Sequence, residues 1–252
     1  MSYLATVLAD NPSHFWRLAD PPGTAVLFDL IAAGRHGIFA NVAYAATGYT
    51  GPASDGGSMY FNSFSPDTRL HHAITLTPPF SVDCWGWAMS DAGVLMSLFG
   101  HNTLLIVLNA ALQPAFRSNA VLSASAVAVT DETWHHYAIV VTALGYTGYV
   151  DGAVVVGPIA DPTAALLGKM QLGNGTAAGT PWGGYIAELA SYPAALTGVR
   201  VAAHFAAGDS ATNVPVLGTF SGNPGTGPNA GNLSAGVSLS DLRKAVYRTF
   251  TD

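Results

Sequence analysis

The acidic residues are the first place to look for chemistry in this sequence, because most sugar-cleaving enzymes need a pair of carboxylates. Only two glutamates occur, Glu132 and Glu188, and no stretch places carboxylates at alternate positions, where a strand would turn them to one face. The sequence has no Gly-x-Ser-x-Gly elbow and no phosphate-cradling loop, and its serines, histidines and aspartates are too scattered to indicate a triad. These patterns predict a protein that is not an enzyme.

Histidines offer a second route to chemistry, through metal binding. Two adjacent pairs occur, His71–His72 and His135–His136. Adjacent residues of a strand point to opposite faces of the sheet, so neither pair can converge on one ion without ligands from elsewhere. We therefore expect these histidines to be polar strand residues or hydrogen-bonded core residues, and metal binding by histidine stays the alternative.

The segment from Thr133 to Gly152 gives the clearest structural pattern in the chain. Residues 134–141 alternate with a period of two and are rich in aromatic and β-branched side chains, as a strand requires. Gly145 permits a reversal, and a second extended run ends at Asp151-Gly152, a dipeptide suited to a tight turn. The segment predicts a hairpin, with a further strand at 154–156.

The rest of the chain repeats this pattern of short strands separated by turn residues. The uncharged segment 92–116 is interrupted by a turn at 100–103, which favours two buried strands over a membrane span. One helix is predicted after the N-cap Thr197, with Val199 and residues 202–205 on its apolar face and Gly208 just past its end. Residues 20–57 are expected to be rich in loops. The hairpin's first strand is expected near 134–142, and the other strands near 14–18, 58–61, 69–76, 80–88, 94–99, 104–108, 115–117, 121–129, 146–150, 170–172 and 185–192.

Four stretches, in this order, resemble one family. They are FWRL at 15–18 with Asp29 and GRHG at 34–37, FSVDCW at 80–85, WHHYA at 134–138 with the YVDG turn at 149–152, and GYIAELASY at 184–192 with ALT at 195–197. Together they resemble the laminin-G-like and concanavalin A-like jelly-roll domains over residues 3–208. The resemblance and the strand pattern imply an all-β, two-sheet antiparallel jelly-roll sandwich with one short helix. Residues 1–210 are therefore assigned to this domain.

The resemblance also implies a cofactor, because many domains of this family carry calcium at the rim of the sandwich. The acidic residues nearest the family motifs are Asp29, Asp151 and Glu188. Each has a structural alternative, since Asp151 is a turn former, Asp29 a loop residue and Glu188 a partner for a neighbouring backbone group. Ala187 stands where the family usually has an acidic residue, which argues against a complete site.

The composition changes beyond residue 210. Residues 211–232 are dominated by Gly, Asn, Pro and Ser and are predicted to be an extended linker. Residues 233–252 are predicted to form an amphipathic helix, which is marginal in water unless its apolar face is packed. We expect it to dock on another subunit or another protein, and packing on its own sandwich stays the alternative. The apolar stripe contains Leu239, Leu242, Val246 and Phe250, and the flanking basic residues are Arg243, Lys244 and Arg248.

The charge pattern narrows the class of partner. A net charge of −6 with nine basic residues argues against nucleic acid. Residues 1–8 lack the basic and long apolar regions of a signal peptide, so synthesis in a cytoplasm is expected. Aromatic side chains that could stack on sugar rings are Tyr44, Tyr49, Tyr60 and Trp182.

Domains of this family are common in bacteriophage particles, so the resemblance implies a non-enzymatic structural and adhesive virion protein. A minor tail, fibre or head-decoration subunit is expected, docked to other virion proteins as a homo-oligomer and binding glycans of the host surface. The alternative is a free bacterial carbohydrate-binding lectin or an accessory module of a glycan-processing enzyme.

Overall fold

A computed structural model describes residues 2–18, 26–32, 37–39, 58–61, 68–89, 93–99, 101–173 and 182–209. The chain divides into two units, Met1–Thr219 and Phe220–Asp252, and every described residue belongs to the first unit. The predicted linker and C-terminal helix therefore lie outside the described residues, as do the seven residues expected to dock a partner.

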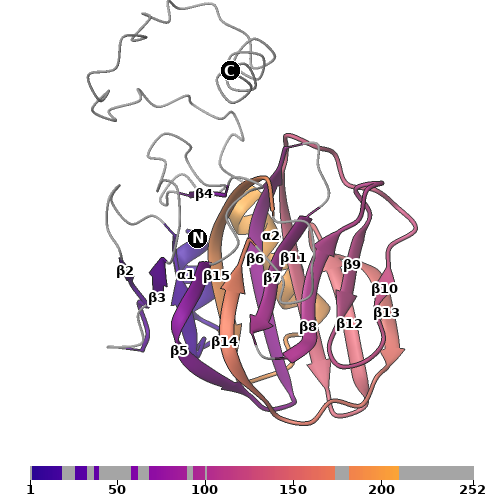
Figure 1. Cartoon of the computed structure of the whole chain (residues 1–252), viewed down its shortest axis with the longest axis horizontal. Coiled ribbons are helices and arrows are strands. Elements are labelled where there is room, and N and C mark those ends of the chain that lie inside the picture. Colours follow the sequence, from indigo (N-terminus) through magenta and orange to yellow (C-terminus); the bar gives the residue numbers. More distant parts are fainter. Residues whose placement is uncertain are drawn as a thin grey trace, which may run out of the picture. The chain divides into compact units, whose positions relative to one another are not determined.

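Two antiparallel sheets form the domain (Figure 1). The first sheet has the order β1-β15-β6-β11-β12-β13, with β4 paired to β15, and the second has the order β10-β9-β8-β7-β14-β5-β3-β2. This arrangement confirms the predicted all-β sandwich. The strands of the first sheet are β1 (His14–Trp16), β4 (Met59–Phe61), β6 (Phe80–Ala88), β11 (Trp134–Thr142), β12 (Gly145–Val150), β13 (Ala153–Ala160) and β15 (Gly184–Tyr192). Those of the second sheet are β2 (Val26–Leu27), β3 (Gly37–Phe39), β5 (Thr68–Leu76), β7 (Gly93–Phe99), β8 (His101–Leu108), β9 (Pro114–Arg117), β10 (Ser123–Ala124) and β14 (Leu166–Leu172).

Two helices, α1 (Tyr3–Leu8) and α2 (Gly198–Asp209), contact each other and pack on the outer face of the first sheet. The predicted cap of α2 is confirmed, because the Thr197 hydroxyl accepts a hydrogen bond from the Arg200 N–H at 3.3 Å. The predicted apolar face is wrong at Val199, which is 79% exposed, whereas Phe205 packs against a buried apolar cluster. Gly208 lies inside α2 rather than past its end, and a Cβ there would lie 2.3 Å from the Trp85 ring. Helix α1 was not expected from the sequence.

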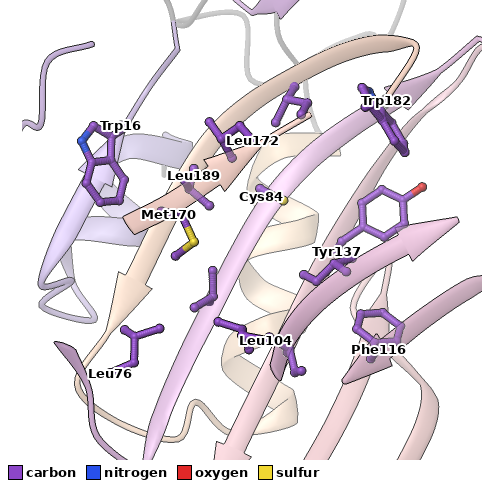
Figure 2. Packing of buried hydrophobic residues seen from close by; sticks show 14 of the residues in the cluster. Trp16, Leu76, Cys84, Leu104, Phe116, Tyr137, Met170, Leu172, Trp182 and Leu189 are labelled. Carbon is purple, nitrogen blue, oxygen red and sulfur yellow. The ribbon is translucent and has the colours of Figure 1, made fainter. Parts of the chain in front are cut away.

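Both faces of strand β11 are buried. On the inner face, Tyr137, Ile139 and Val141 belong to the apolar core between the two sheets, part of which Figure 2 shows. On the outer face, Trp134 and Ala138 pack in a second apolar cluster with residues of β6, β15 and both helices. The first sheet is therefore the central layer of a helix–sheet–sheet arrangement rather than one wall of a simple sandwich.

Most strand boundaries agree with the sequence prediction, and the bounds of β6 and β11 are those expected. The predicted strand at 121–129 is wrong, because only Ser123–Ala124 is extended and paired. The chain before it is instead held by the Asp161 carboxylate, which accepts hydrogen bonds from the N–H groups of residues 119–121. Residues 101–103, predicted to be a turn, belong to β8. None of the described helices is long and apolar enough to cross a membrane.

The predicted turn at Asp151-Gly152 joins β12 to β13. Both residues have positive φ, 50° and 77°, which is the conformation that a two-residue hairpin turn of this twist requires. The turn also places the Asp151 carboxylate beside β11, where it accepts a hydrogen bond from the His136 N–H at 2.9 Å.

Candidate functional site

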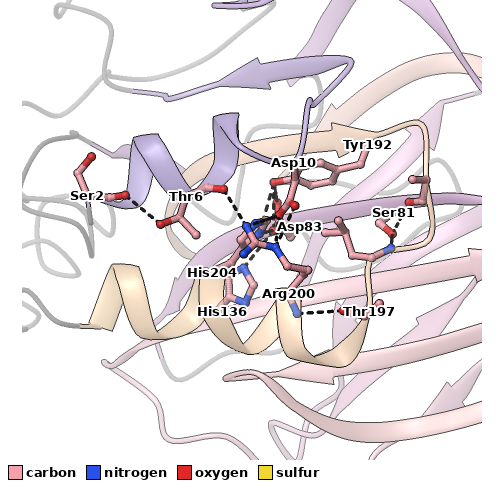
Figure 3. Close-up of polar contacts among 12 residues, drawn as sticks. Ser2, Thr6, Asp10, Ser81, Asp83, His136, Tyr192, Thr197, Arg200 and His204 are labelled. Atoms are coloured by element: carbon pink, nitrogen blue, oxygen red, sulfur yellow. Dashed lines mark hydrogen bonds and ion pairs between the residues drawn. The ribbon is translucent and has the colours of Figure 1, made fainter.

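Asp83 of β6, His136 of β11 and His204 of α2 meet beneath the two helices, on the outer face of the first sheet (Figure 3). We call these three residues the buried polar cluster. All three are 0% exposed. Within the described part of the chain, they are the one group of three His, Cys, Asp or Glu side chains with possible metal-ligand atoms all within 4.8 Å of one another. Buried ionisable groups need partners, so this convergence is the first candidate for function.

The strand register explains why Asp83 and His136 share this face. His136 pairs with Trp85 and Ala138 pairs with Asp83, so His136 and Asp83 are diagonal neighbours across β6 and β11. His204 comes from the helix above, three residues after the buried Val201, and so lies on the face of α2 turned toward the sheet. Three distant segments are thus brought to one point.

The contacts of Asp83 are short and directional. Its Oδ2 lies 2.7 Å from His204 Nδ1, and the Tyr192 hydroxyl donates to Oδ1 at 3.2 Å. His136 Nε2 lies 3.4 Å from Oδ2, but neither ring nitrogen of His136 makes a hydrogen bond. The Asp83 carboxylate therefore contacts His204 of α2, His136 of β11 and the Tyr192 hydroxyl. The buried His136 imidazole makes no hydrogen bond.

A second carboxylate holds the other side of His204. Asp10, just after α1, places Oδ2 at 2.7 Å from His204 Nε2 and also accepts from the Arg200 Nε at 2.9 Å. Ionised carboxylates only accept hydrogen bonds, so an imidazole between two of them carries protons on both nitrogens. The chain Asp83–His204–Asp10–Arg200 thus alternates negative and positive groups from the buried interior to the surface.

The protonation of the buried polar cluster follows from these contacts. Burial opposes the charge on His204, but the hydrogen bonds and charges of Asp83 and Asp10 outweigh burial and raise the pKa of His204 above its usual 6.5. Burial likewise opposes the charge on Asp83, yet its contacts with His136 and His204 lower its pKa from 3.8 to about 2. These shifts favour the aspartate form of Asp83 and the imidazolium form of His204.

Such a closed cluster can fasten helices to a sheet, hold a proton between carboxylates, or accept a metal ion. It cannot touch a polysaccharide at the surface, because its three side chains are completely buried. Sequence reasoning missed it. The available signal was the presence of polar residues at positions where strand alternation or helix spacing predicts burial, but alternation alone does not name partners from other elements.

The histidine pair at 135–136 behaves as the strand geometry predicts. His135 lies on the opposite face from His136, with Nδ1 at 2.6 Å from Asp151 Oδ2 and Nε2 at 3.0 Å from the Thr130 carbonyl. His136 meets its neighbours beneath the helices. The groups from other elements that lie close enough to share an ion with His136 are Asp83 and His204.

The three residues expected to bind calcium have separate protein partners. Asp29 is contacted by His14 Nδ1 at 2.7 Å and accepts from the Phe15 N–H at 3.1 Å. Burial opposes its charge, but these hydrogen bonds outweigh burial and lower the pKa of Asp29. Glu188 accepts two hydrogen bonds from the Arg17 guanidinium, at 3.1 and 2.9 Å on Oε1. Asp151 pairs with His135, as described above. They do not form one close group of ligands within the described residues, and calcium binding stays a prediction.

Of the four aromatic residues expected to stack on sugars, the structure describes the side chain of Trp182. Trp182 is a core residue, 0% exposed, with its Nε1 donating to the Tyr185 carbonyl at 3.3 Å, so the predicted stacking role of Trp182 is wrong. Its neighbours in sequence gave no sign of this burial. Tyr44 and Tyr49 lie outside the described residues, and for Tyr60 only the backbone, in β4, is described.

Residues 55–202 match the family described as the concanavalin A-like lectin/glucanases superfamily. A comparison with curated protein sequences gave no match. The sialidase of Trypanosoma rangeli is similar in structure, with a TM-score of 0.52 and 14% sequence identity over 76% of this chain and 32% of that chain. The chain thus spans about a third of the sialidase. Domain 4 of AbnA, an extracellular arabinanase from Geobacillus stearothermophilus in complex with arabinotriose, is similar with a TM-score of 0.55 and 16% identity, over 77% of this chain and 97% of that domain.

Proposed function

This chain belongs to the concanavalin A-like lectin/glucanases superfamily, and we propose that it is a non-enzymatic adhesive module that binds glycans. The observation that carries the proposal is the likeness to the arabinanase domain, because that comparison covers 97% of a domain captured with arabinotriose. A match to a whole domain supports a self-contained binding module. The sialidase comparison supports the same proposal, because this chain resembles only about a third of a protein that processes glycans.

The outer face of the second sheet is the surface we assign to the glycan. The described helices both pack on the first sheet, which leaves this face open among the described elements (Figure 1). Phe116 and Ile106 pair across β9 and β8 and point into the core, so the adjacent pair Arg117 and Leu105 points outward. Arg117 is half-buried and brings a guanidinium, whose Nε is buried and makes no hydrogen bond within the protein. A guanidinium beside an aliphatic surface suits the hydroxyls and ring face of a sugar.

The lack of catalysis is proposed from the carboxylates. Most enzymes that cleave a glycosidic bond use one carboxylic acid and one carboxylate at the scissile bond. Glu188 is bound to Arg17, and Asp83 is bound to His204 beneath the helices. We expect no release of reducing sugar from arabinan, sialylated glycans or β-glucans above that of a heat-inactivated sample, and a clear rate above that background would refute this part of the proposal.

Binding is tested with the full chain on a glycan array, followed by titration calorimetry of the strongest ligands, with arabinotriose and sialyllactose included. We expect Arg117→Ala to weaken binding by about tenfold, the loss of roughly one charged hydrogen bond. Val199→Ser is the matched control, because Val199 is exposed on α2, on the other sheet. If no glycan on the array is bound, the proposal is wrong. If both variants lose the same affinity, the assigned surface is wrong.

We further propose that the module is carried on a bacteriophage particle. The support is the sequence of residues 233–252, whose apolar stripe needs a partner. Replacing both Leu242 and Val246 with Asp should abolish oligomerisation or particle incorporation while leaving the thermal midpoint of the sandwich unchanged. A large fall in the midpoint with assembly intact would sink this docking role. The comparisons with enzymes favour a second candidate, an accessory module of a glycan-processing enzyme. In that case both the wild type and the variant with Asp at 242 and 246 would be monomers.

A further inference from the structure

We propose that the buried polar cluster is a zinc site, in which Asp83, His136 and His204 bind one ion. The donors are one carboxylate oxygen and two imidazole nitrogens, which are ligands that zinc takes in proteins. They come from β6, β11 and α2, so the ion would join the helix layer to the sheet. This inference is independent of glycan binding.

The distances suit a tetrahedral ion. Zinc bonds of about 2.0–2.1 Å place neighbouring ligand atoms of a tetrahedron about 3.3–3.4 Å apart. His136 Nε2 lies 3.4 Å from Asp83 Oδ2. The Tyr192 hydroxyl lies 3.4 Å from Asp83 Oδ2 and 3.5 Å from His204 Nδ1, so it is close enough to these two ligand atoms to offer a fourth oxygen. One edge is shorter, the 2.7 Å contact between His204 Nδ1 and Asp83 Oδ2.

In the metal-free protein, the His204 Nδ1 proton lies between Nδ1 and Asp83 Oδ2, where the ion would bind. On binding, His204 releases the Nδ1 proton to solvent and the Nδ1–H···Oδ2 hydrogen bond breaks. Asp83 Oδ2, His204 Nδ1 and the unprotonated Nε2 of His136 each form a bond to zinc, and the ion releases water molecules in exchange. His204 Nδ1 and Asp83 Oδ2 then separate to about 3.3 Å.

His136 gives the independent sign of a missing ligand. Its side chain is 0% exposed, and neither of its ring nitrogens has a hydrogen-bond partner. A buried polar atom without a partner has lost its contacts with water and gained none in return, so such atoms are uncommon in folded proteins. The Trp85 ring, 5.2 Å away between centroids, packs beside the imidazole, whose Nε2 is directed toward Asp83. An ion on Nε2 would satisfy this nitrogen.

The groups behind His204 match the surroundings of known metal ligands. A histidine that binds a metal usually donates its other N–H to a carboxylate, which fixes the tautomer and the ring. Asp10 provides that carboxylate at 2.7 Å from Nε2, and Arg200 holds Asp10 in turn (Figure 3). Asp10 and Arg200 are partly exposed, which makes the junction of α1 and α2 the path by which an ion would enter.

The test uses the full chain, stripped with a chelator, dialysed and loaded with zinc, with bound metal counted by mass spectrometry. We expect one zinc ion per chain in the wild type and in His135→Asn, and a rise in the thermal midpoint on loading. His135 is the matched control because it lies next to His136 but on the other face of β11. His136→Asn should weaken zinc binding by more than about 100-fold, since loss of even an outer partner costs about 10–100-fold.

Cobalt(II) gives a second readout that needs no variant. Bound in place of zinc, it should show the intense visible bands of a tetrahedral ion in the wild-type protein, and zinc should remove them. Wild-type protein without these bands, or without more zinc than His136→Asn, would overturn the proposal. Equal zinc binding by all three proteins would also overturn it, because surface histidines would then be the ligands.

Discussion

The two faces of strand β11 are both buried, but they are buried by different kinds of contact. The inner face presents Tyr137, Ile139 and Val141 to the second sheet, and its contacts are apolar. The outer face presents Trp134 and Ala138 to an apolar cluster but places His136 between them, beside Asp83 and His204. One strand thus separates a core held by packing alone from a core that also holds charges.

The difference shows which contacts fix the position of the two helices on the first sheet. A sheet face covered by another sheet is fixed by many strand registers, whereas a helix on a sheet can slide or rotate along apolar contacts. The Asp83–His204–Asp10 chain joins β6, α2 and the end of α1 at defined distances. We infer that these contacts fix the position of both helices, at the cost of burying charge.

The largest effect is expected for Trp134→Ala, which removes a ring that is only 5% exposed on the outer face of β11. The lost contacts and the cavity should reduce the free energy of unfolding by about 3–5 kcal/mol. Urea unfolding followed by circular dichroism measures this. A loss below about 1 kcal/mol would mean that the helix layer contributes little to the packing of Trp134.

Asp83→Asn should cost about 3 kcal/mol in the metal-free protein, because it leaves the buried His204 imidazolium without one of its two carboxylates. Asp151→Asn is the control, since its carboxylate is partly exposed and contacts His135 on the other face of β11. That variant should lose less than about 1 kcal/mol. Equal effects of the two substitutions would show that the outer face does not depend on buried charge.

Acid should weaken the metal-free protein through Asp83. The pKa of Asp83 is about 2 in the folded protein against its ordinary 3.8, so the unfolded chain takes up this proton first as the pH falls. The stability from this group is complete above about pH 4 and is lost as the pH falls through 2, a loss of about 2 kcal/mol. Urea unfolding at pH 5 and pH 2 should show this loss in the wild type and less of it in Asp83→Asn. Equal pH dependence in both proteins would contradict it.

The smallest effect is expected on the inner face, for Tyr137→Phe. The Tyr137 hydroxyl is buried and has no hydrogen-bond partner, so its removal takes away an uncompensated desolvation cost. Stability should stay within about 0.5 kcal/mol of the wild type or rise by about 1 kcal/mol. His136→Phe, which changes a similar ring on the outer face, should lower stability when zinc is present. A loss of more than 1 kcal/mol in Tyr137→Phe would reveal a polar partner on the inner face.

Strand alternation was enough to predict much of this fold. The bounds of β6 and β11 and the turn at Asp151-Gly152 follow from period-two patterning and from local turn conformation, which neighbouring residues largely determine. The failure at 121–129 has a distant cause. Asp161 captures the N–H groups of residues 119–121 from forty residues away, and no local pattern reports such a bond.

The sequence by itself determined that His136 shares a face of β11 with Trp134, because successive side chains of a strand alternate. Only the tertiary structure decided what that face meets. Asp83 lies 53 residues earlier and His204 lies 68 residues later, and they reach His136 through the register of β6 and the packing of α2. Gly208 shows the same limit, since its role depends on the Trp85 ring against which α2 packs. Side-chain direction is a local property of the backbone, whereas the identity of the partner is set by packing between elements far apart in the chain.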